Sequence, residues 1–441
     1  MTKIEPKNVH SILRTHMLVD GFPMVVDLEK SQGSYLYDAL EGKRYLDFFM
    51  FFATQPVGHN HPKLQDEAFQ KRLLRAAMTN PTNSDFYTVE MAEFVDTFSR
   101  LAMPEYLPYL FLIAGGALAV ENALKTAFDW KIRKNFAKGY KQEKGSRVIH
   151  FREAFHGRAG YTLSLTDPFD TNKVKYFPKF DWPRVLNPKI TFPLNEENLK
   201  KVKEAEAESL RQIKQAIKDY PDDIAAIIIE PIQGEGGDNH FRKEFFQQLR
   251  TIADENDILL IFDEVQTGVG LTGKMWAHQN FGVQPDIMAF GKKTQVCGIL
   301  ASRRMDEVAE NVFKVPSRLN STWGGNLVDM VRFGKYLEII AEENLLANAK
   351  HQGEYFLSQL HSLHQEMPEQ MFNVRGLGLF IAFDMPTTAD RDQFLKVLYK
   401  NGLVAFKCGT RTIRFRPALN VSRNEIDEAL GIIQKSLKEC F

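Results

Sequence analysis

The run DILLIFDE, residues 257–264, consists of five consecutive apolar residues between an aspartate and two adjacent acids. Four other apolar runs are also of strand length and lack alternation: PYLFLIA (108–114), SRVIHF (146–151), IAAIIIEP (224–231) and PDIMAF (285–290). Such runs are typical of parallel strands that are buried on both faces, and amphipathic helical patterns lie between them. We therefore predict an α/β fold with a mostly parallel central sheet, helices on both faces, and ligands at the carboxyl ends of the strands.

The chain of 441 residues is longer than one hydrophobic core usually serves, so more than one domain is expected. Turn signals separate short strand candidates near the N-terminus, and long helical patterns precede two candidates for antiparallel strands near the C-terminus. We predict an N-terminal segment (1–60), a large domain (61–330) and a small C-terminal domain (331–441). The chain termini together would form the smaller α+β unit.

Composition argues against nucleic acid and membranes as partners. The 56 basic and 56 acidic residues balance, whereas nucleic acid and anionic membranes select clustered Lys and Arg. The sequence lacks the apolar core of a signal peptide and a window long enough to span a bilayer. Three widely spaced cysteines fit neither a disulfide framework nor a CxxC metal site, which favours a reducing compartment. We expect a soluble cytoplasmic protein whose partners are small molecules or copies of itself.

A glycine-rich run, GVGLTGK at 268–274, matches GxGxxG and most of a Walker A motif. A P-loop needs a Ser or Thr hydroxyl for magnesium at position 275, where this chain has Met275. The strand that resembles a Walker B motif also comes directly before the loop rather than after it. A nucleotide hydrolase is therefore only a remote alternative, and a glycine-rich turn is the simpler interpretation.

Groups that suit pyridoxal phosphate follow several of the predicted strands. Gly115 and Gly116 precede a helical pattern, where bare backbone N–H groups and the helix dipole favour a phosphate. Asp263 ends a buried strand, where a carboxylate needs a cationic partner such as a protonated pyridine nitrogen. Phe155 offers a flat aromatic ring after another strand. These residues predict a cofactor site at one edge of the sheet.

Two adjacent lysines, Lys292 and Lys293, follow the last of these strands and offer the amine that pyridoxal phosphate requires. Such a lysine forms a Schiff base with the cofactor aldehyde and moves a proton on the substrate. Consecutive side chains of extended backbone point to opposite faces, so only one of the two lysines can enter the site. Sequence physics alone leaves the choice between them open.

The chain resembles the class III (omega) aminotransferases, which are fold-type-I enzymes dependent on pyridoxal phosphate. The stretches that carry the resemblance are GSYLYDALEGKRYLDF with GHNHP, EPIQGEGG, FDEVQTGVGLTGK, PDIMAFGKK, STWGGN and IRFRP, in the order typical of the family. In that family the Schiff-base lysine follows a glycine directly, which selects Lys292. The resemblance leaves Lys293 turned away, towards solvent.

The resemblance also implies roles for other cofactor-binding residues. Asp263 corresponds to the acid on the pyridine nitrogen, and Gln266 to the group near the ring hydroxyl, where it also meets the substrate. Phe155 corresponds to the stacked aromatic, and the loop Gly115, Gly116 and Ala117 to the phosphate cradle. Thr322 corresponds to a threonine that reaches the phosphate of the other subunit, so a homodimer with shared sites is expected.

Substrate-binding residues follow from the resemblance as well. Arg414 corresponds to the arginine that holds an α-carboxylate, although Arg416 points the same way by strand periodicity. Glu235 corresponds to an acid that neutralises this arginine when the substrate has no carboxylate there. Such a pair would act as a switch between two substrates.

Within the class, the runs GGALAVENALK, FHGRAGYTLSLT and FGKKTQVCG resemble the enzymes that act on the ε-amine of L-lysine. This resemblance implies transfer of that amine to 2-oxoglutarate, which gives L-glutamate and an aldehyde that cyclises to a piperideine carboxylate. Arg158 would hold the distal carboxylate of lysine. Another ω-aminotransferase, acting on ornithine or a similar diamine, is the alternative.

Four polar residues near these motifs are predicted to have structural roles or no role in the chemistry. His59 and His61 lack the further spaced ligands of a metal site, so no metal is expected. His156 is assigned no chemistry. Glu264 should lie on the strand face opposite Asp263, in a structural ion pair.

Overall fold

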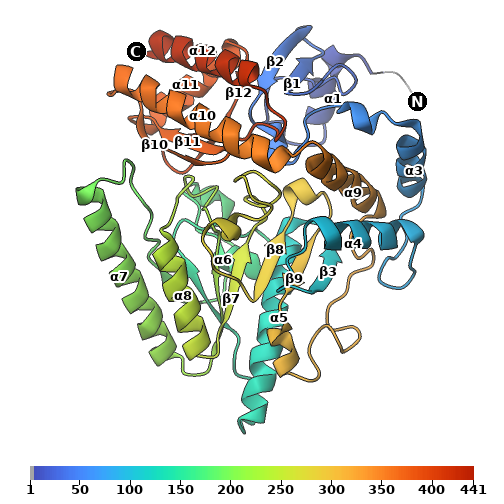
Figure 1. The fold of residues 1–441 in the computed structure, drawn as a ribbon, viewed down its shortest axis with the longest axis vertical. Helices are drawn as coiled ribbons and strands as arrows, with labels where there is room; N and C mark the ends of the chain where they lie inside the picture. The colour runs from blue at the N-terminus through green and yellow to red at the C-terminus, as the bar shows by residue number, and fades with distance from the viewer. Residues whose placement is uncertain (1–3) are drawn as a thin grey trace.

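The central sheet of the protein has seven strands, in the order β3-β9-β8-β7-β6-β4-β5, in a computed structural model that describes residues 4–441 (Figure 1). The strands are β3 (Tyr109–Ile113), β4 (Arg147–Phe151), β5 (Arg184–Val185), β6 (Ile224–Ile229), β7 (Leu259–Asp263), β8 (Ile287–Phe290) and β9 (Cys297–Ala301). Strands β4 to β8 pair in parallel, whereas β9 is antiparallel to both β8 and β3. The prediction of a mostly parallel sheet is confirmed, and β9 is an addition to it.

Helices cover both faces of this sheet, as predicted. Helix α5 (Gly116–Ala137) packs on one face, and α7 (Glu196–Asp219) and α8 (Lys243–Glu255) pack on the other (Figure 1). Strand β7 shows why its sequence does not alternate: Leu259 and Ile261 join the apolar cluster beneath α5. Leu260, on the opposite face, joins the cluster beneath α8. Each residue of the strand therefore loses its contact with water.

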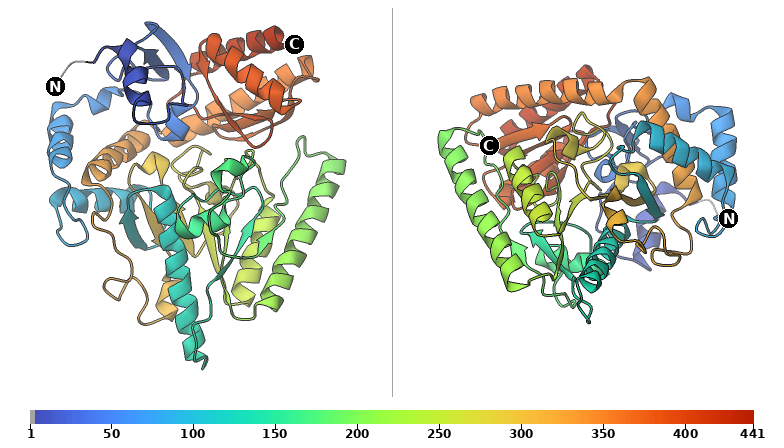
Figure 2. Two further views of the ribbon diagram at one scale, coloured as in Figure 1. Left: turned by 180° about the vertical axis from the view of Figure 1, so that it is seen from behind. Right: turned by 60° about the horizontal axis from the view of Figure 1, so that its bottom comes forward.

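Two smaller sheets are built from the ends of the chain. One has the order β1-β2-β12, and the other β10-β11-β14-β13. Their strands are β1 (Tyr35–Asp38), β2 (Lys43–Asp47), β12 (Leu403–Val404), β10 (Phe372–Leu377), β11 (Phe380–Asp384), β13 (Phe406–Cys408) and β14 (Thr412–Phe415). Because β12 pairs in parallel with β2, the N-terminal and C-terminal segments lie side by side (Figure 2). The two predicted antiparallel strand candidates near the C-terminus correspond to β11 and β14, which pair antiparallel, and β10 is an additional strand beside β11.

The remaining helices surround these sheets. They are α1 (Val9–Arg14), α2 (Met50–Ala53), α3 (Glu67–Met78), α4 (Val89–Leu101), α6 (Gly160–Leu165), α9 (Leu327–Glu342), α10 (Leu345–Glu366), α11 (Thr388–Lys400) and α12 (Arg423–Cys440). Short 3-10 helices are η1 (Pro6–Asn8), η2 (Pro62–Leu64), η3 (Thr171–Lys173), η4 (Ala277–Asn280), η5 (Lys292–Thr294) and η6 (Arg303–Glu307). Helices α10 and α11 pack on the four-stranded sheet, and α12 packs on both of them.

The loops that follow β6 and β7 meet the four-stranded sheet. The Gly409 N–H donates to the Glu235 carbonyl oxygen at 2.8 Å, which joins the loop after β6 to the turn between β13 and β14. The carboxyl ends of the parallel strands therefore face the C-terminal sheet, and side chains from both can meet there.

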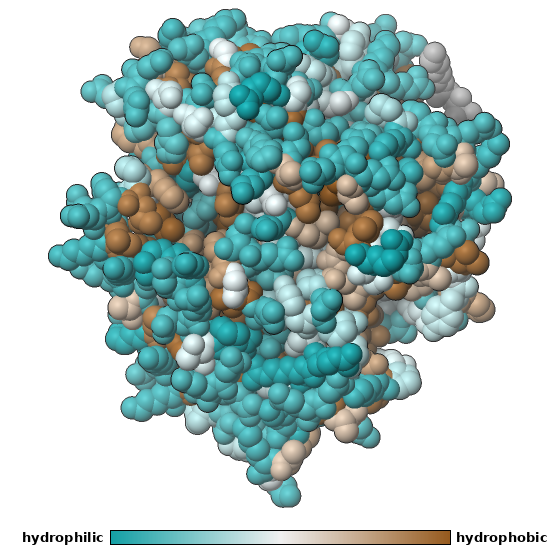
Figure 3. All heavy atoms as spheres, viewed as in Figure 1, coloured by the Kyte–Doolittle hydropathy of each residue, from teal (hydrophilic) through white to brown (hydrophobic). Residues whose placement is uncertain are grey.

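The surface shown in Figure 3 is mostly hydrophilic, with hydrophobic residues in scattered patches. Across residues 4–441, none of the helices combines the length and apolar character that crossing a bilayer requires.

Candidate active site

A cavity of about 360 Å³ lies at the carboxyl ends of the parallel strands. Its walls come from the N-terminus of α5 and from the loops that follow β4, β6, β7 and β8. The lining residues are Gly116, Ala117, Phe155, His156, Gly157, Arg158, Glu230, Glu235, Asp263, Val265, Gln266 and Lys292. Most of the residues singled out in the sequence are thus brought together in one place.

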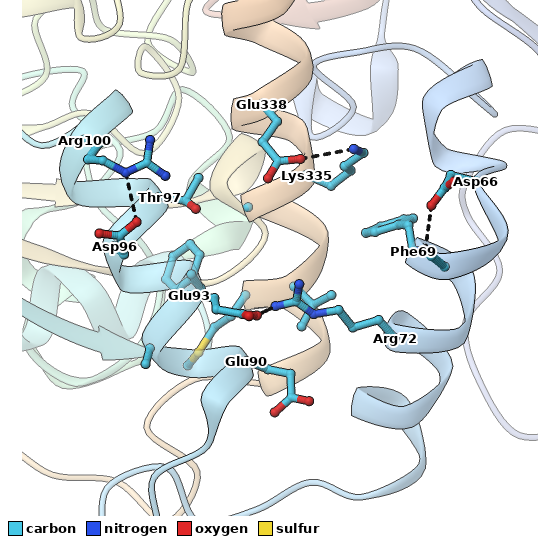
Figure 4. A pocket seen from close by; sticks show the side chains of 16 residues that line it. Asp66, Phe69, Arg72, Glu90, Glu93, Asp96, Thr97, Arg100, Lys335 and Glu338 are labelled. Carbon is cyan, nitrogen blue, oxygen red and sulfur yellow. Dashed lines mark hydrogen bonds and ion pairs between the residues drawn. The ribbon is translucent and has the colours of Figure 1, made fainter.

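A larger hollow, of about 650 Å³, lies between α3, α4 and α9 (Figure 4). Its charged side chains are largely paired with one another: Arg72 with Glu93, Arg100 with Asp96, and Lys335 with Glu338. Asp66 caps the helix α3 through the Phe69 N–H. Charges that neutralise each other offer little to a ligand, so the cavity beside Lys292 is the better candidate.

The two adjacent lysines have different surroundings. Lys292 lines the cavity, whereas Lys293 is 1% exposed and donates from Nζ to the Gln266 carbonyl oxygen at 2.6 Å. The expectation that Lys293 turns to solvent is wrong, because the chain does not continue as extended strand after β8. It folds into the 3-10 turn η5, with a left-handed φ of 54° at Lys292, and this turn directs Lys293 beneath the loop after β7.

Burial lowers the pKa of Lys292, and the Asp263 carboxylate opposes this only in part. The pKa of Lys293 lies well below its ordinary value for the same reason, with repulsion from Lys292 added. A lowered pKa favours the neutral amine, which is the nucleophilic form. Only the Lys292 amine has access to the cavity.

Asp263, which is 4% exposed, is held by two hydrogen bonds. Its Oδ2 lies 2.7 Å from His156 Nδ1, and its Oδ1 accepts from the Val265 N–H at 3.0 Å. Burial alone would lower the pKa of His156, but the Asp263 carboxylate outweighs this and raises the pKa. The imidazole therefore fixes the position of the Asp263 carboxylate.

Glu264 points to the opposite face of the strand, as predicted. Its carboxylate accepts from the backbone N–H groups of Ala277 and His278, and it lies 2.9 Å from His278 Nδ1. It is 1% exposed and does not line the cavity. Of these two adjacent buried carboxylates, Asp263 therefore lines the cavity, whereas Glu264 holds the backbone and side chain of the η4 segment in place.

Helix α5 begins at the cavity without a side-chain cap. Gly115 precedes it with φ 101°, a left-handed conformation that favours glycine, and a Cβ there would meet nothing within 4 Å. A Cβ on Gly116 would lie 2.9 Å from Val265 Cγ1, so the backbone packs closely against the loop after β7. Uncapped N–H groups beside open space are suited to a phosphate.

Glu235 lies between two cations at the edge of the cavity. Its Oε2 accepts from Arg414 Nη2 at 2.8 Å, and its Oε1 accepts from Lys173 Nζ. Burial alone would raise the pKa of Glu235, but Arg414 and Lys173 outweigh it and hold the pKa below its usual value. Arg414 is 1% exposed, and its Nη1 also donates to Gln266 Oε1 at 3.2 Å.

Arg416 has a different partner from Arg414, although both belong to β14 or its end. Its Nη2 donates to Asp238 Oδ1 at 2.6 Å, and this pair is fully buried. Its guanidinium also stacks on the Phe380 ring at 3.3 Å. Its Nη2 also donates to Gln266 Oε1 in the cavity wall at 3.3 Å, but its counter-charge, Asp238, lies outside the cavity, whereas the counter-charge of Arg414, Glu235, lines it.

Residues 17–437 match the family model "Aminotransferase class-III". The chain belongs to the class III aminotransferase family. It is 53% identical to the L-lysine-epsilon aminotransferase of Mycobacterium tuberculosis over 98% of this chain and 96% of the relative. The L-lysine-epsilon aminotransferase of Streptomyces clavuligerus is 46% identical, over 98% and 95%. A solved structure, the lysine aminotransferase from M. tuberculosis in the internal aldimine form, superposes with a TM-score of 0.97 and 52% identity, covering 99% of this chain and all of that one.

The class III aminotransferases use pyridoxal phosphate, and the residues at the cavity fit this cofactor. The uncapped N-terminus of α5 could hold the phosphate, and Asp263 the pyridine nitrogen. Phe155 supplies an aromatic ring, and Lys292 supplies the only lysine amine that residues 4–441 place in the cavity wall. Membership of the family also excludes the nucleotide hydrolase. The run at 268–274 is followed by the 3-10 helix η4 rather than by the helix of a P-loop.

Two predicted site residues of the aminotransferase lie at or beyond the edge of the cavity. Arg158 lines the cavity yet is exposed, and it pairs with no carboxylate in the part of the chain that the structure describes. Thr322 is exposed and does not line the cavity of its own chain. Its loop is fixed by Ser84, whose hydroxyl donates to the Ser321 carbonyl oxygen at 2.8 Å.

The two histidines that follow β2 have carboxylate partners. His59 Nε2 lies 2.9 Å from Asp47 Oδ2, and His61 Nε2 lies 3.2 Å from Glu343 Oε2. Over residues 4–441, no cluster of three or more His, Cys, Asp or Glu side chains is arranged to hold a metal ion.

Sequence reasoning missed three residues of the aminotransferase site. His156 was given no chemistry, yet it contacts Asp263. Lys173 gave no signal, because it comes from a loop without a motif. Glu230, in EPIQGEGG, lines the cavity and accepts from the Phe155 N–H at 2.9 Å; burial raises its pKa to about 7. An acid directly after the buried run IAAIII was the signal that could have indicated Glu230.

Proposed function

We propose that this aminotransferase moves the ε-amino group of L-lysine to 2-oxoglutarate. The products would be L-2-aminoadipate 6-semialdehyde, which cyclises to a piperideine carboxylate, and L-glutamate. The observation that carries the proposal is the Arg414–Glu235 pair beside Lys292, because it suits a site that must accept two kinds of substrate end. The names of the relatives at 46–53% identity support lysine as the donor.

Bound pyridoxal phosphate supplies an electron sink for the carbon that carries the amine. Lys292 would hold the cofactor and move a proton at the substrate carbon, and its lowered pKa suits a base that works near neutral pH. Asp263, fixed by His156, would keep the ring nitrogen protonated. Gln266 and Phe155 would orient the ring.

Glu235 would decide which substrate end is accepted beside the reacting amine. Lysine brings methylene groups there, so a charged Arg414 would face apolar atoms unless Glu235 neutralised it. Glutamate brings its α-carboxylate, which suits the planar guanidinium of Arg414 once Glu235 has released it. Arg158 would hold the distal carboxylate of either substrate, since among residues 4–441 it is the arginine in the cavity wall, and it pairs with no carboxylate there.

The assembly and location of the enzyme belong to the same proposal. A homodimer would let Thr322, which lies outside the cavity of its own chain, reach the phosphate in the partner's site. Trp323, an apolar neighbour that is 49% exposed, supports a contact of this kind.

We propose the cytoplasm as the compartment of the enzyme. We also propose a division into an N-terminal segment (1–60), a large domain (61–330) and a small C-terminal domain (331–441); the parallel pairing of β2 with β12 supports one smaller unit formed by both chain ends.

Two experiments test this function. Profiling L-lysine, L-ornithine and other ω-amino donors with 2-oxoglutarate should give lysine the highest kcat/KM, and a preference for ornithine would reject the proposed donor.

Single-turnover half-reactions, followed by cofactor absorbance, test the switch between Glu235 and Arg414. Glu235→Gln should impair the lysine half-reaction more than the glutamate half-reaction, whereas Arg414→Ala should do the reverse. Equal losses in both half-reactions for Glu235→Gln would reject the switch.

A further inference from the structure

The Glu235 carboxylate has a second cation, Lys173, on the side away from Arg414. Lys173 ends η3, in the loop between α6 and β5, and contacts the oxygen that Arg414 does not use. The Lys173 side chain is 30% exposed, whereas Arg414 is 1% exposed. One partner of Glu235 is therefore close to solvent, and the other lies in the wall between two sheets.

The backbone around Glu235 leaves only the side chain free to change position. The Glu235 carbonyl oxygen accepts from the Gly409 N–H, and a Cβ on Gly236 would lie 2.2 Å from the Glu153 carbonyl oxygen. A Cβ on Gly234 would lie 2.3 Å from Gln266 Oε1. Because the backbone on both sides of Glu235 is packed this closely, we expect Arg414 to be released by rotation of the Glu235 side chain.

We propose that Lys173 is a positioning residue that keeps hold of Glu235 while Arg414 binds the α-carboxylate of the glutamate substrate. This inference rests on the proposed switch between Glu235 and Arg414. A carboxylate that loses its only cation in a mostly buried site is strongly disfavoured. Lys173 reduces that penalty. With Lys173 present, the Glu235 carboxylate still has one cationic partner after Arg414 leaves, whereas without Lys173 it would have none.

The charges around Glu235 support this assignment. Over residues 4–441, its carboxylate pairs with Lys173 and Arg414 and with no third cation. Gln266, the other neighbour of Arg414, is neutral and cannot replace Lys173 as a counter-charge. Lys173 pairs with no other carboxylate in the same residues, so its charge is committed to Glu235. Without Lys173, Arg414 would be held more tightly in its pair.

The test uses the holoenzyme and the variant Lys173→Met, which keeps an unbranched side chain only one atom shorter and removes its charge. We expect the dissociation constant for L-glutamate, from single-turnover kinetics, to rise about tenfold, while that for L-lysine changes by less than about twofold. Lys175→Met is the matched control, because Lys175 is exposed on the same loop and lies over the Tyr176 ring instead. It should change neither constant.

Two further variants separate positioning from a general effect on the loop. In a Glu235→Gln background the added effect of Lys173→Met should vanish, and Lys173→Arg should restore glutamate binding. An unchanged glutamate constant, an equal change for both substrates, or an effect that persists without Glu235 would overturn the proposal. If the wild-type enzyme does not use lysine, the proposed donor fails; the role of Lys173 is still decided by comparing glutamate with an ω-amine that does react.

Discussion

Replacing Asp263 with Asn removes one charge and changes little else. The carboxylate is 4% exposed and bonded to the Val265 N–H and to His156 Nδ1. The amide oxygen of Asn can still accept from Val265, while its NH2 group meets the imidazole. The ring nitrogen of the cofactor then loses its counter-charge, whereas the uncapped N-terminus of α5 and Lys292 are untouched. We expect Asp263→Asn to retain cofactor and to turn over slowly.

The size of the effect follows from burial. Removing one partner of a buried charge pair typically costs about 3–5 kcal/mol. If this cost falls on the transition state, the rate falls by about two to four decades, since about 1.4 kcal/mol corresponds to tenfold. The rate is measured in the single-turnover half-reaction with L-lysine, and cofactor content from the absorbance of the protein after gel filtration.

Glu264→Gln is the matched control, because Glu264 is the next residue, is equally buried and faces away from the cavity. It should lower the free energy of unfolding and leave the half-reaction within about threefold of the wild type. An Asp263→Asn enzyme within threefold of wild type would remove Asp263 from the mechanism. Equal losses in the two variants would show that buried charge as such, and not its position, matters.

Lys292→Ala should abolish turnover, whereas Lys293→Met should keep the bound cofactor and its absorbance, because only the first amine lines the cavity. Borohydride reduction and peptide mapping identify the attached lysine, and a cofactor trapped on Lys293 would contradict this. His156→Gln tests the raised pKa of His156: the protonated ring stabilises the fold fully below pH 6.5, and this contribution is lost as the pH rises through the raised pKa. The difference in free energy of unfolding between wild type and His156→Gln should therefore shrink above pH 6.5, and denaturant titrations that give a constant difference would refute it.

The central sheet could be predicted from sequence because burial on both faces leaves a local signature, as in the run 257–264. Strand β9 could not be predicted in the same way. Its residues Cys297–Ala301 are apolar, but nothing in them indicates antiparallel insertion between β8 and β3. The position and direction of β9 depend on its packing between β8 and β3 beneath α5, which involves residues far apart in the sequence. Local patterns indicate that a strand forms, and they do not identify its neighbours.

The residues of the site likewise fall into those that local sequence predicts and those that it does not. Residues at strand ends, such as Asp263, were predictable because a buried charge needs a partner. The partner itself was not, since His156 lies 107 positions earlier in the chain, and Lys173 lies 62 positions before Glu235. The course of Lys293 was mistaken because the expectation assumed extended backbone, whereas η5 turns the chain. Partner choice and turn geometry are set by packing that a single sequence does not display.

Arg414 lies on the last strand and Arg416 directly follows it, which has a consequence for synthesis of the protein. The ribosome releases Asp263 and Lys292 well before it releases β14, so a nascent chain carries its reactive amine while both guanidiniums are still missing. Until they arrive, Glu235 and Asp238 lack the arginines that bind them in the finished fold. A product truncated before β14 would keep the cofactor-attachment lysine, yet Asp238 would be buried without its counter-charge and Glu235 would keep Lys173 alone, which favours its unfolding and removal over partial activity.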